Sequence, residues 1–192
     1  MSNVRLDLYS VKEFQPGSFW KRLLWYFTSR IFFKTLIPYP SFFKVWVLKL
    51  FGANVGKGVV VKPQIQIKYP WNLVIGNHTW IGEGVWIDNL DSVQIGSQCC
   101  ISQGAMLLCG NHDFTSSTFD LNTKPILLED GVWIGAKCII APGVKCAKNS
   151  VLSAGLFTSK SLEENTIYSQ SMIFNTKPRI IKQQLDNPEI PK

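Results

Sequence analysis

Branched aliphatic residues recur at every sixth position over long stretches of this chain. The clearest run covers residues 126–155, where the repeated position holds Leu128, Ile134, Ile140, Cys146 and Leu152. A short fixed period is typical of a stacked solenoid, in which each repeat buries its apolar residue against the neighbouring coils. The hydrophobic pattern therefore predicts a repeat architecture.

Three earlier ladders have the same period, with short additions between them. They are Val55, Val61 and Ile67; Ile75, Ile81 and Ile87; and Ile95, Ile101 and Leu107. Four residues beyond the ladder position the side chain is usually small or β-branched, as at Val59, Ile65, Thr79, Val85, Cys99, Ala105, Val132, Cys138, Val144 and Ser150. Residues i and i+4 share one face of an extended chain, so two inward positions per six residues indicate a coiled strand and not a helix.

Glycine often follows the ladder residue directly, at Gly56, Gly76, Gly82, Gly96 and Gly135. Glycine reaches backbone angles that cost other residues energy. We therefore predict that the chain turns through such angles at these five positions.

Two stretches carry a resemblance to a known family. They are GVWIDNLDSVQIGSQCCISQGAMLLCGNHD at residues 84–113 and KPQIQIKYPWNLVIG at residues 62–76. With the repeat, they resemble the hexapeptide-repeat acyltransferases, and most closely the colanic-acid-biosynthesis type of acetyltransferase, a relative of the maltose, galactoside and nodulation-factor acetyltransferases. The resemblance implies an all-β solenoid, a left-handed parallel β-helix with three hexapeptides per coil. It also implies trimers with sites between subunits.

The resemblance and the change in composition along the chain predict three parts. Residues 1–51 form an N-terminal aromatic and basic helical segment, and residues 52–174 form the β-helix with an inserted loop at 108–126. Residues 175–192 form a short C-terminal tail. With 192 residues and 46% hydrophobic residues, the chain can bury a sizeable core.

The formal net charge of +7 makes an anionic partner plausible, either nucleic acid, a phosphorylated cofactor or an acidic membrane surface. The sequence contains no nucleic-acid motif, so no nucleic-acid partner is expected. Coenzyme A carries phosphates that would use such charge. The five cysteines are odd in number and lack zinc spacing, so we interpret them as small buried residues in a reducing compartment and expect no metal.

Residues 18–51 are crowded with aromatic side chains, but lysine and arginine interrupt every apolar run. They cannot supply the ~20 apolar residues of a membrane span. We expect two short helices separated at Ile37–Pro40, because proline ends helices. These helices either cap the first coil of the solenoid or lie on an anionic membrane, and both can hold at once.

The first residues lack the apolar core of a signal peptide, so we expect a cytoplasmic protein. If the helices bind lipid, we expect the protein to lie at the inner face of the membrane.

The candidate catalytic residue is His112, at the base of a polar excursion between Leu107 and Leu128. Insertions in solenoids map to functional loops, and an imidazole can accept a proton from a hydroxyl near neutral pH. His112 also matches the catalytic histidine of the family in position. His78, the other histidine, is interpreted as a surface residue. A covalent acyl-enzyme on Cys109 is the alternative mechanism, which we disfavour because nothing marks this thiol as activated.

The other site residues come from the resemblance. It implies that Asn89 and Asp91 contact the acceptor sugar, although Asn89 stands where several relatives have aspartate. It also implies that Trp133 is a substrate-binding residue that lines the site near the donor. It also implies that coenzyme A is held by small residues along one edge and by polar and basic residues near the C-terminus, namely Ala136, Ala154, Ser159, Lys160 and Arg179. The family's GNPA motif has become Asn175–Pro178 in this chain, a departure next to the adenine end of the donor site.

These observations predict an acetyl-coenzyme-A-dependent O-acetyltransferase that acts on a saccharide, in the synthesis of a surface polysaccharide. Two alternatives stay open: a nucleotide-sugar N-acyltransferase with an amine acceptor, and a structural or carbohydrate-binding solenoid without activity. A γ-type carbonic anhydrase needs three histidines around zinc, and the chain has two.

Overall fold

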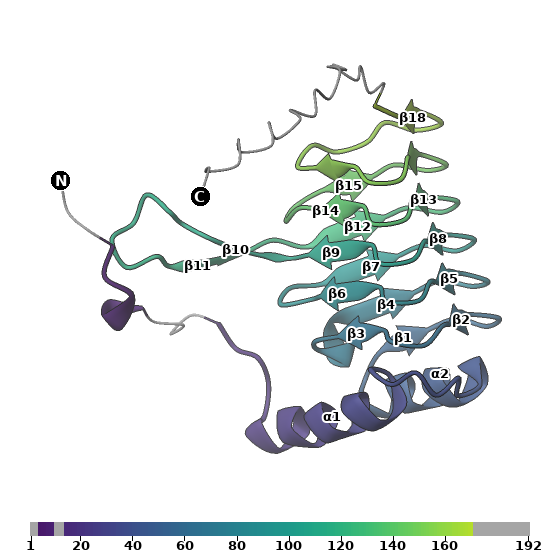
Figure 1. The fold of residues 1–192 in the computed structure, drawn as a ribbon, viewed down its shortest axis with the longest axis horizontal. Coiled ribbons are helices and arrows are strands. Elements are labelled where there is room, and N and C mark those ends of the chain that lie inside the picture. The colour runs from purple at the N-terminus through teal and green to yellow at the C-terminus, as the bar shows by residue number, and fades with distance from the viewer. Residues whose placement is uncertain (1–3, 10–13, 171–192) are drawn as a thin grey trace, which may run out of the picture.

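Three parallel sheets form the faces of a β-helix in the computed structural model, which describes residues 4–9 and 14–170 (Figure 1). Each of the first five coils contributes one short strand to each sheet, and the last described coil contributes only β18, to sheet B. In spatial order, sheet A contains β1 (Asn54–Val55), β4 (Leu73–Ile75), β7 (Val93–Ile95), β12 (Ile126–Leu128) and β15 (Lys145–Cys146). Sheet B contains β2 (Val60–Val61), β5 (Trp80–Ile81), β8 (Cys100–Ile101), β13 (Trp133–Ile134), β16 (Val151–Leu152) and β18 (Ile167–Tyr168). Sheet C contains β3 (Gln66–Ile67), β6 (Trp86–Asp88), β9 (Met106–Leu108), β14 (Ile139–Ile140) and β17 (Phe157–Thr158).

The register places each ladder residue above its equivalent in the coil below. Val55 pairs with Ile75 in sheet A, and Ile75 pairs with Ile95. Every ladder residue from Val55 to Leu152 is buried, and so are all ten of the small or β-branched residues named above at the position four residues further on. The hydrophobic period thus predicted the coils, their register and their core, and the solenoid fold is confirmed.

The glycines after the ladder residues are needed for a different reason from the one predicted. Positive φ angles occur later in each turn, for example at Gly58 and Gly84. Gly76 instead lies against the next coil, where an added Cβ would come within 2.5 Å of the backbone carbon of Gly96. Close approach of stacked backbones, and not an unusual turn angle, excludes a side chain there.

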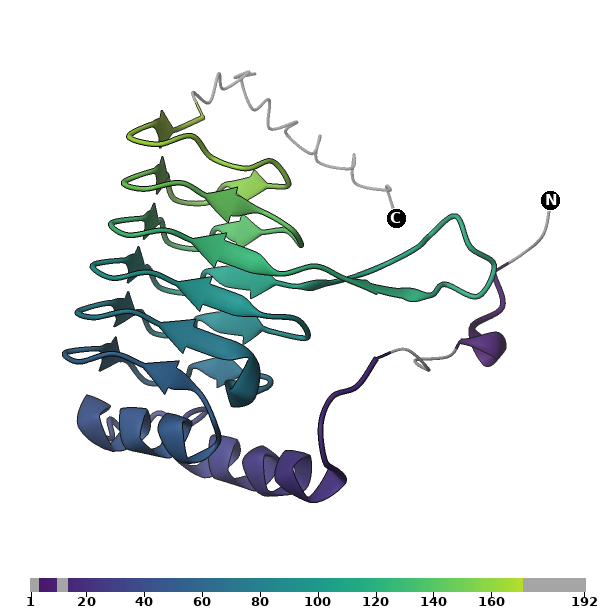
Figure 2. The ribbon, with the colours of Figure 1, turned by 180° about the vertical axis from the view of Figure 1, so that it is seen from behind.

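Two helices cover the N-terminal end of the solenoid, α1 (Phe19–Phe32) and α2 (Ser41–Leu50) (Figures 1 and 2). Their inner faces satisfy the open edge of the first coil, because the Trp25 indole donates to the carbonyl of Ile67 at 2.9 Å. Lys44 Nζ likewise donates to the carbonyl of Lys62 at 2.9 Å, and the amide of Val61 donates to Ser41 Oγ at 3.0 Å. The helices therefore cap the strand edge, as one of the two predicted interpretations required.

One hairpin leaves the solenoid sideways. It consists of β10 (Gly110–His112) and β11 (Leu121–Thr123), which pair antiparallel between β9 and β12. Figure 2 shows it projecting far from the coils, with residues 4–9 beside its tip, where the Arg5 amide donates to the carbonyl of Ser117 at 2.7 Å. Two short 3₁₀ helices complete the described secondary structure, η1 (Leu6–Leu8) and η2 (Pro70–Asn72). The predicted tail at 175–192 lies outside the described residues.

Candidate active site

His112 stands on β10, where the hairpin leaves the corner between sheets C and A. Its partner across the hairpin is Leu121. The ladder is interrupted here by polar residues, so the chain departs from the coil and carries the imidazole outward. The candidate base is thus held by paired strands, which fix its position better than a free loop would.

Phe119 orients the imidazole in two ways. His112 Nδ1 lies 3.0 Å from the carbonyl oxygen of Phe119, and the two rings stack with centroids 4.4 Å apart and planes 8° apart. A carbonyl only accepts hydrogen bonds, so the neutral imidazole carries its proton on Nδ1. No described residue contributes a hydrogen bond to Nε2, whose lone pair is the one that could accept a proton.

Phe119 holds this position in a backbone conformation that is rare for an aromatic residue. Its φ of 53° lies in the left-handed region, which is strained for bulky side chains. Strain of this kind is often found at functional sites, where the surrounding structure maintains it. Here the strained residue is the one that supplies the carbonyl to His112.

A cavity of about 330 Å³ opens beside the imidazole. Its lining combines aromatic side chains with a carboxylate and an ammonium, from Tyr9, Phe14, Lys68, Tyr69, Asp88, Leu90, Gly110, His112 and Leu121. Concave sites with apolar walls and a few polar groups are typical of small-molecule binding. Aromatic faces beside hydrogen-bonding groups suit a sugar, which has apolar C–H faces and hydroxyl edges.

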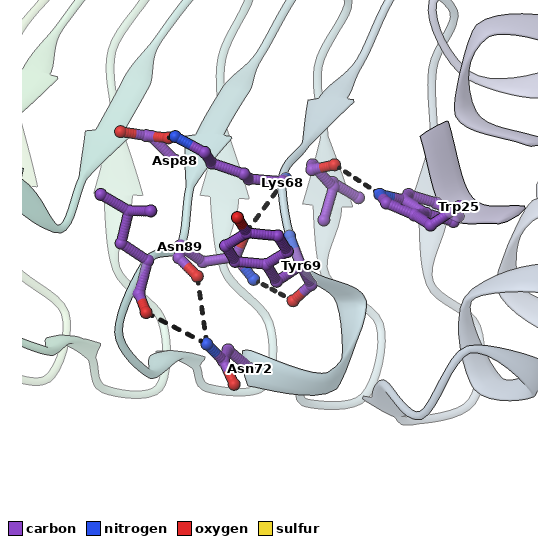
Figure 3. Close-up of polar contacts among 8 residues, drawn as sticks. Trp25, Lys68, Tyr69, Asn72, Asp88 and Asn89 are labelled. Carbon is purple, nitrogen blue, oxygen red and sulfur yellow. Dashed lines mark hydrogen bonds and ion pairs between the residues drawn. The ribbon is translucent and has the colours of Figure 1, made fainter. Parts of the chain in front are cut away.

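Asp88 and Lys68 form the polar side of this cavity, and Figure 3 shows their side chains next to each other. They follow the ladder residues of consecutive coils, and Lys68 Nζ lies 3.1 Å from Asp88 Oδ1. The Asp88 side chain is 16% exposed, and beyond this ion pair no described residue donates a hydrogen bond to Oδ1. A mostly buried carboxylate with free acceptor capacity could bind a hydroxyl.

Asn89 points inward instead of lining the cavity. Its side chain is fully buried, and its Oδ1 accepts from the amides of Lys68 at 3.1 Å and Tyr69 at 3.0 Å, while its Nδ2 donates to the carbonyl of Tyr69 (Figure 3). These contacts hold the expanded corner together. We therefore assign Asn89 a structural role, and its neighbour Asp88 takes the place on the cavity wall that we predicted for Asn89.

The other two predicted substrate-binding residues, Asp91 and Trp133, are not in the cavity lining. Asp91 sits on the same corner as His112, but its Oδ1 accepts the amide of Ser92 at 2.6 Å. Trp133 lies on the outer face of sheet B, 51% exposed, and its indole donates to Ser102 Oγ at 2.9 Å. Sheet B does not border the corner from which the hairpin projects.

The structure brings together the small residues predicted for coenzyme A. Ala136 and Ala154 stack at the corner between sheets B and C, where the amide of Gly155 donates to the carbonyl of Ala136 at 2.8 Å. Gly135 lies so close to the next coil that an added Cβ would be 2.5 Å from the Ala154 nitrogen. Ala154 is exposed and Ala136 is half-buried, so this edge of the solenoid is reachable from solvent past small side chains.

Ser159 and Lys160 lie after β17, in the lining of a cavity of about 360 Å³ near the C-terminal end of the described coils. The Lys160 amide donates to Thr158 Oγ1 at 3.1 Å, and its side chain is exposed. Arg179 lies outside the described residues, as does the altered motif at Asn175–Pro178. Within the described ranges, no cluster of three or more histidine, cysteine or acidic residues could hold a metal ion.

Cys109 is unsuited to act as a nucleophile. Its side chain is fully buried, and burial, the main cause, raises the pKa of the thiol to about 12, with Asp91 and Asp88 nearby adding to the effect. Since the thiolate is the reactive form, almost none is present near neutral pH.

We expect Cys109→Ala to retain kcat within about threefold, because the thiol is not in the reaction path. Intact-mass measurement of the native protein after mixing with acetyl-coenzyme A alone should show no added acetyl group on this residue. An adduct that disappears in the Cys109→Ala variant would contradict this expectation.

A parallel β-helix of hexapeptides, with a histidine at the base of a projecting hairpin, defines the class of hexapeptide-repeat acyltransferases. No family model matches the sequence. The chain is 33% identical over 156 residues to a protein named "Putative colanic acid biosynthesis acetyltransferase WcaF" of Escherichia coli (strain K12), covering 81% of this chain and 86% of that protein. It therefore belongs to the hexapeptide-repeat acetyltransferases of the colanic-acid-biosynthesis type.

Two solved structures share its architecture. A hexapeptide-repeat-containing acetyltransferase from Vibrio cholerae superposes with a TM-score of 0.71 at 20% identity, covering 82% of this chain and 92% of that chain. A galactoside acetyltransferase in complex with coenzyme A superposes with a TM-score of 0.68 at 26% identity, covering 77% of this chain and 74% of that chain. Together they support the left-handed β-helix fold.

Proposed function

We propose that this protein transfers an acetyl group from acetyl-coenzyme A to a hydroxyl of a saccharide, in the synthesis of a surface polysaccharide. The observation that carries the proposal is the His112 imidazole, which is held at Nδ1 by the Phe119 carbonyl and borders a cavity suited to a sugar. The relative WcaF is named for colanic acid biosynthesis, and a structural neighbour is a galactoside acetyltransferase.

In this proposal the acceptor sugar lies between the aromatic walls of the cavity, and Asp88 accepts a hydrogen bond from one of its hydroxyls. Nε2 of His112 takes the proton of the reacting hydroxyl, and the Phe119 carbonyl stabilises the imidazolium through Nδ1–H. Acetyl-coenzyme A supplies an activated thioester whose thiolate is the leaving group. His112 can return the proton to that thiolate, which leaves as free coenzyme A, and the imidazole is neutral again for the next turnover.

The residues present fit the donor. Small side chains at Ala136 and Ala154 leave the backbone open along one edge, so a narrow pantetheine arm could approach it. Lys160, which is exposed, would attract a phosphate, and Ser159 adjoins it; Arg179 is proposed from the sequence alone.

The position of these groups supports a homotrimer with shared sites. The edge with Ala136 and Ala154 is the corner between sheets B and C, whereas His112 projects from the corner between sheets C and A. Trp133 is on sheet B, which borders the corner with Ala136 and Ala154 but not the corner from which the hairpin projects. If two chains lie side by side, the hairpin of one can reach the edge with Ala136 and Ala154 of the other. Repeating this head-to-tail contact gives a closed ring, and we propose a ring of three chains. We also propose a cytoplasmic location, where acetyl-coenzyme A is available as the donor.

The proposal is tested by incubating the protein with acetyl-coenzyme A and a panel of free, nucleotide-linked and oligomeric sugars, followed by mass spectrometry. We expect a product that is heavier by one acetyl group and that loses it in mild alkali, because esters hydrolyse readily and amides do not. An alkali-stable product would favour an amine acceptor. Absence of any transfer with the cellular acceptor would favour a binding protein.

Asp88→Asn is expected to raise the KM for the acceptor by roughly tenfold or more, because the amide is a weaker acceptor than the carboxylate and disturbs the contact with Lys68. The KM for acetyl-coenzyme A should change little. Glu164→Gln, at an exposed carboxylate near the C-terminal end of the described coils, is the matched control. An unchanged acceptor KM in Asp88→Asn would remove this residue from the site.

Lys160→Ala is expected to raise the KM for acetyl-coenzyme A several-fold with little change in kcat, since a phosphate contact far from the thioester contributes to binding and not to the chemical step. Increasing salt should reduce the difference from the native protein. Lys57→Ala removes an exposed lysine from a turn of the first coil and serves as the control. With a pantetheine donor that lacks phosphates, the native protein and Lys160→Ala should have equal KM values for the donor, because the lysine then has no phosphate to bind.

A further inference from the structure

The outer face of the helical cap is apolar although it points away from the solenoid. On α1, Trp20, Leu24, Phe27 and Ile31 are 54–73% exposed. They are spaced by four, three and four residues, so they share one side of the helix, opposite the buried Trp25. This stripe is therefore a continuous surface feature and not a set of scattered exposed residues.

The second helix repeats the arrangement. Phe42, Trp46 and Leu50 follow one another at intervals of four residues and are 59–78% exposed. They lie opposite Lys44 and Leu48, which are buried against the first coil. Both inner faces contact the same end of the solenoid, so both apolar stripes face outward from that end (Figure 1). We call these seven residues the platform.

Positive charge surrounds the platform. Lys21, Arg30, Lys34 and Lys49 are exposed on or next to the two helices. Residues 14–82 contain nine lysines and arginines and no acidic residue, whereas the rest of the chain contains eleven basic and thirteen acidic residues. The charge of the whole protein is thus concentrated in the cap and the first coils.

Neither α1, with 14 residues, nor α2, with 10, is long enough to cross a bilayer, and the described residues contain no candidate membrane span. A helix with aromatic and aliphatic residues on one side and basic residues beside them is suited to lie in the plane of a membrane interface. Tryptophan favours the headgroup level, and lysine and arginine attract anionic lipids.

We propose that the platform binds the surface of an anionic lipid membrane, with the helices parallel to the bilayer and the solenoid standing on it. A second copy of the chain fits the platform less well, because two surfaces with this excess of positive charge repel each other. A nucleic acid would use the charges but would leave the apolar stripes without a partner. The proposal does not depend on the acetyl-transfer activity.

The test is co-sedimentation of the full-length protein with vesicles of phosphatidylcholine alone, or with about one third phosphatidylglycerol. We expect binding to the anionic vesicles at roughly 0.05 M salt and a loss of at least tenfold in affinity at roughly 0.5 M, because salt screens the attraction. Lack of binding to anionic vesicles at low salt would overturn the proposal.

Two pairs of substitutions separate the contributions. Leu24→Ser with Ile31→Ser should weaken binding at least tenfold, and Lys34→Gln with Lys49→Gln roughly fivefold for each charge removed. The matched control is Ile167→Ser, which removes a side chain that is 70% exposed near the opposite end of the solenoid. All of these side chains are solvent-exposed, so unfolding temperature and acetyl-coenzyme A turnover without vesicles should stay near the native values.

Other occupants would give different results. If the serine pair lowers the oligomeric size in solution while vesicles are ignored, the platform is an interface between copies of the chain. If the serine pair binds anionic vesicles as well as the native protein and double-stranded DNA competes for binding, the surface is a general polyanion site. Either result would overturn the membrane assignment.

Discussion

Replacing His112 with alanine is expected to lower kcat by a factor of about 10² to 10⁴, the range typical of losing a general base. The affinity for coenzyme A should stay close to that of the native protein, because the groups proposed to hold the donor, the edge at Ala136 and Ala154 and the Lys160 side chain, do not include the imidazole. The measurement is steady-state turnover on the true acceptor, with coenzyme A binding followed by calorimetry. The fold should persist, since the imidazole lies on the hairpin and not in the core.

His78→Asn is the matched control, because it removes the other histidine, which is exposed in a turn. His78 has a φ of 56°, an angle that asparagine tolerates better than most residues. Near-native turnover in His112→Ala, with a reduced rate in His78→Asn, would show that the base has been assigned to the wrong residue. Addition of free imidazole should partly restore the His112→Ala variant if the missing function is proton transfer.

The core of the solenoid could be predicted from the sequence because its period is short and strictly local. Each coil repeats the same inward positions, and Ile81, Ile101 and Ile134 are found in one column of sheet B. The handedness comes from family resemblance, because spacing alone does not distinguish the two directions of coiling. The reason for the glycines was wrong, since the stacking distance between coils is a property of the assembled fold and not of one turn.

The candidate site was harder to predict than the core. Breaks in the repeat located the His112 hairpin correctly, but they did not distinguish Asn89, which turns inward, from Asp88, which borders the cavity. A usable signal was present, because coils in this part of the chain are 20 residues long, as the pairing of Gln66 with Trp86 shows. Lys68 and Asp88 have that separation, so a polar pair on one wall could have been inferred.

The contributions of residues 4–9 and Phe14 to the cavity had no sequence signal. Tyr9 lies with its ring centroid 5.7 Å from that of His112, although more than a hundred residues separate them. Contacts of this kind depend on the placement of residues 4–9 beside the hairpin. Periodicity does not carry that information, since the segment belongs to no repeat.

Lys44 is a charged residue, but its side chain is buried between the helical cap and the first coil and connects the two by hydrogen bonds. Its side chain is 1% exposed, and Nζ donates to the carbonyl oxygens of Val61 at 3.2 Å and Lys62 at 2.9 Å. These carbonyls belong to the edge of the first coil, where no further coil follows. A buried ammonium is unfavourable by itself, and burial lowers the pKa of Lys44. Without it, however, the Lys62 carbonyl would lack a donor, and the Val61 carbonyl would keep only the long 3.5 Å contact from Ser41 Oγ.

Lys44→Met is therefore expected to lower the free energy of unfolding by about 2–4 kcal/mol. The orphaned Lys62 carbonyl and the weakly satisfied Val61 carbonyl each cost at most about 1–3 kcal/mol, and relief of the buried charge offsets part of this. The midpoint of thermal unfolding should fall by roughly 4–16 °C at a fixed protein concentration. Lys49→Met, on the outer face of the same helix, should change stability by no more than about 0.5 kcal/mol.

The effect of Lys44 should also depend on pH in a defined direction. Because burial lowers its pKa in the folded protein, the unfolded chain binds more protons at this residue below the usual lysine value of about 10.4. The stability of the native protein should therefore rise relative to Lys44→Met as the pH increases toward that value, and the neutral amine can still donate to both carbonyls. Equal stability of the two proteins at neutral pH would mean that other donors satisfy the edge of the first coil, and that Lys44 is not required to cap it.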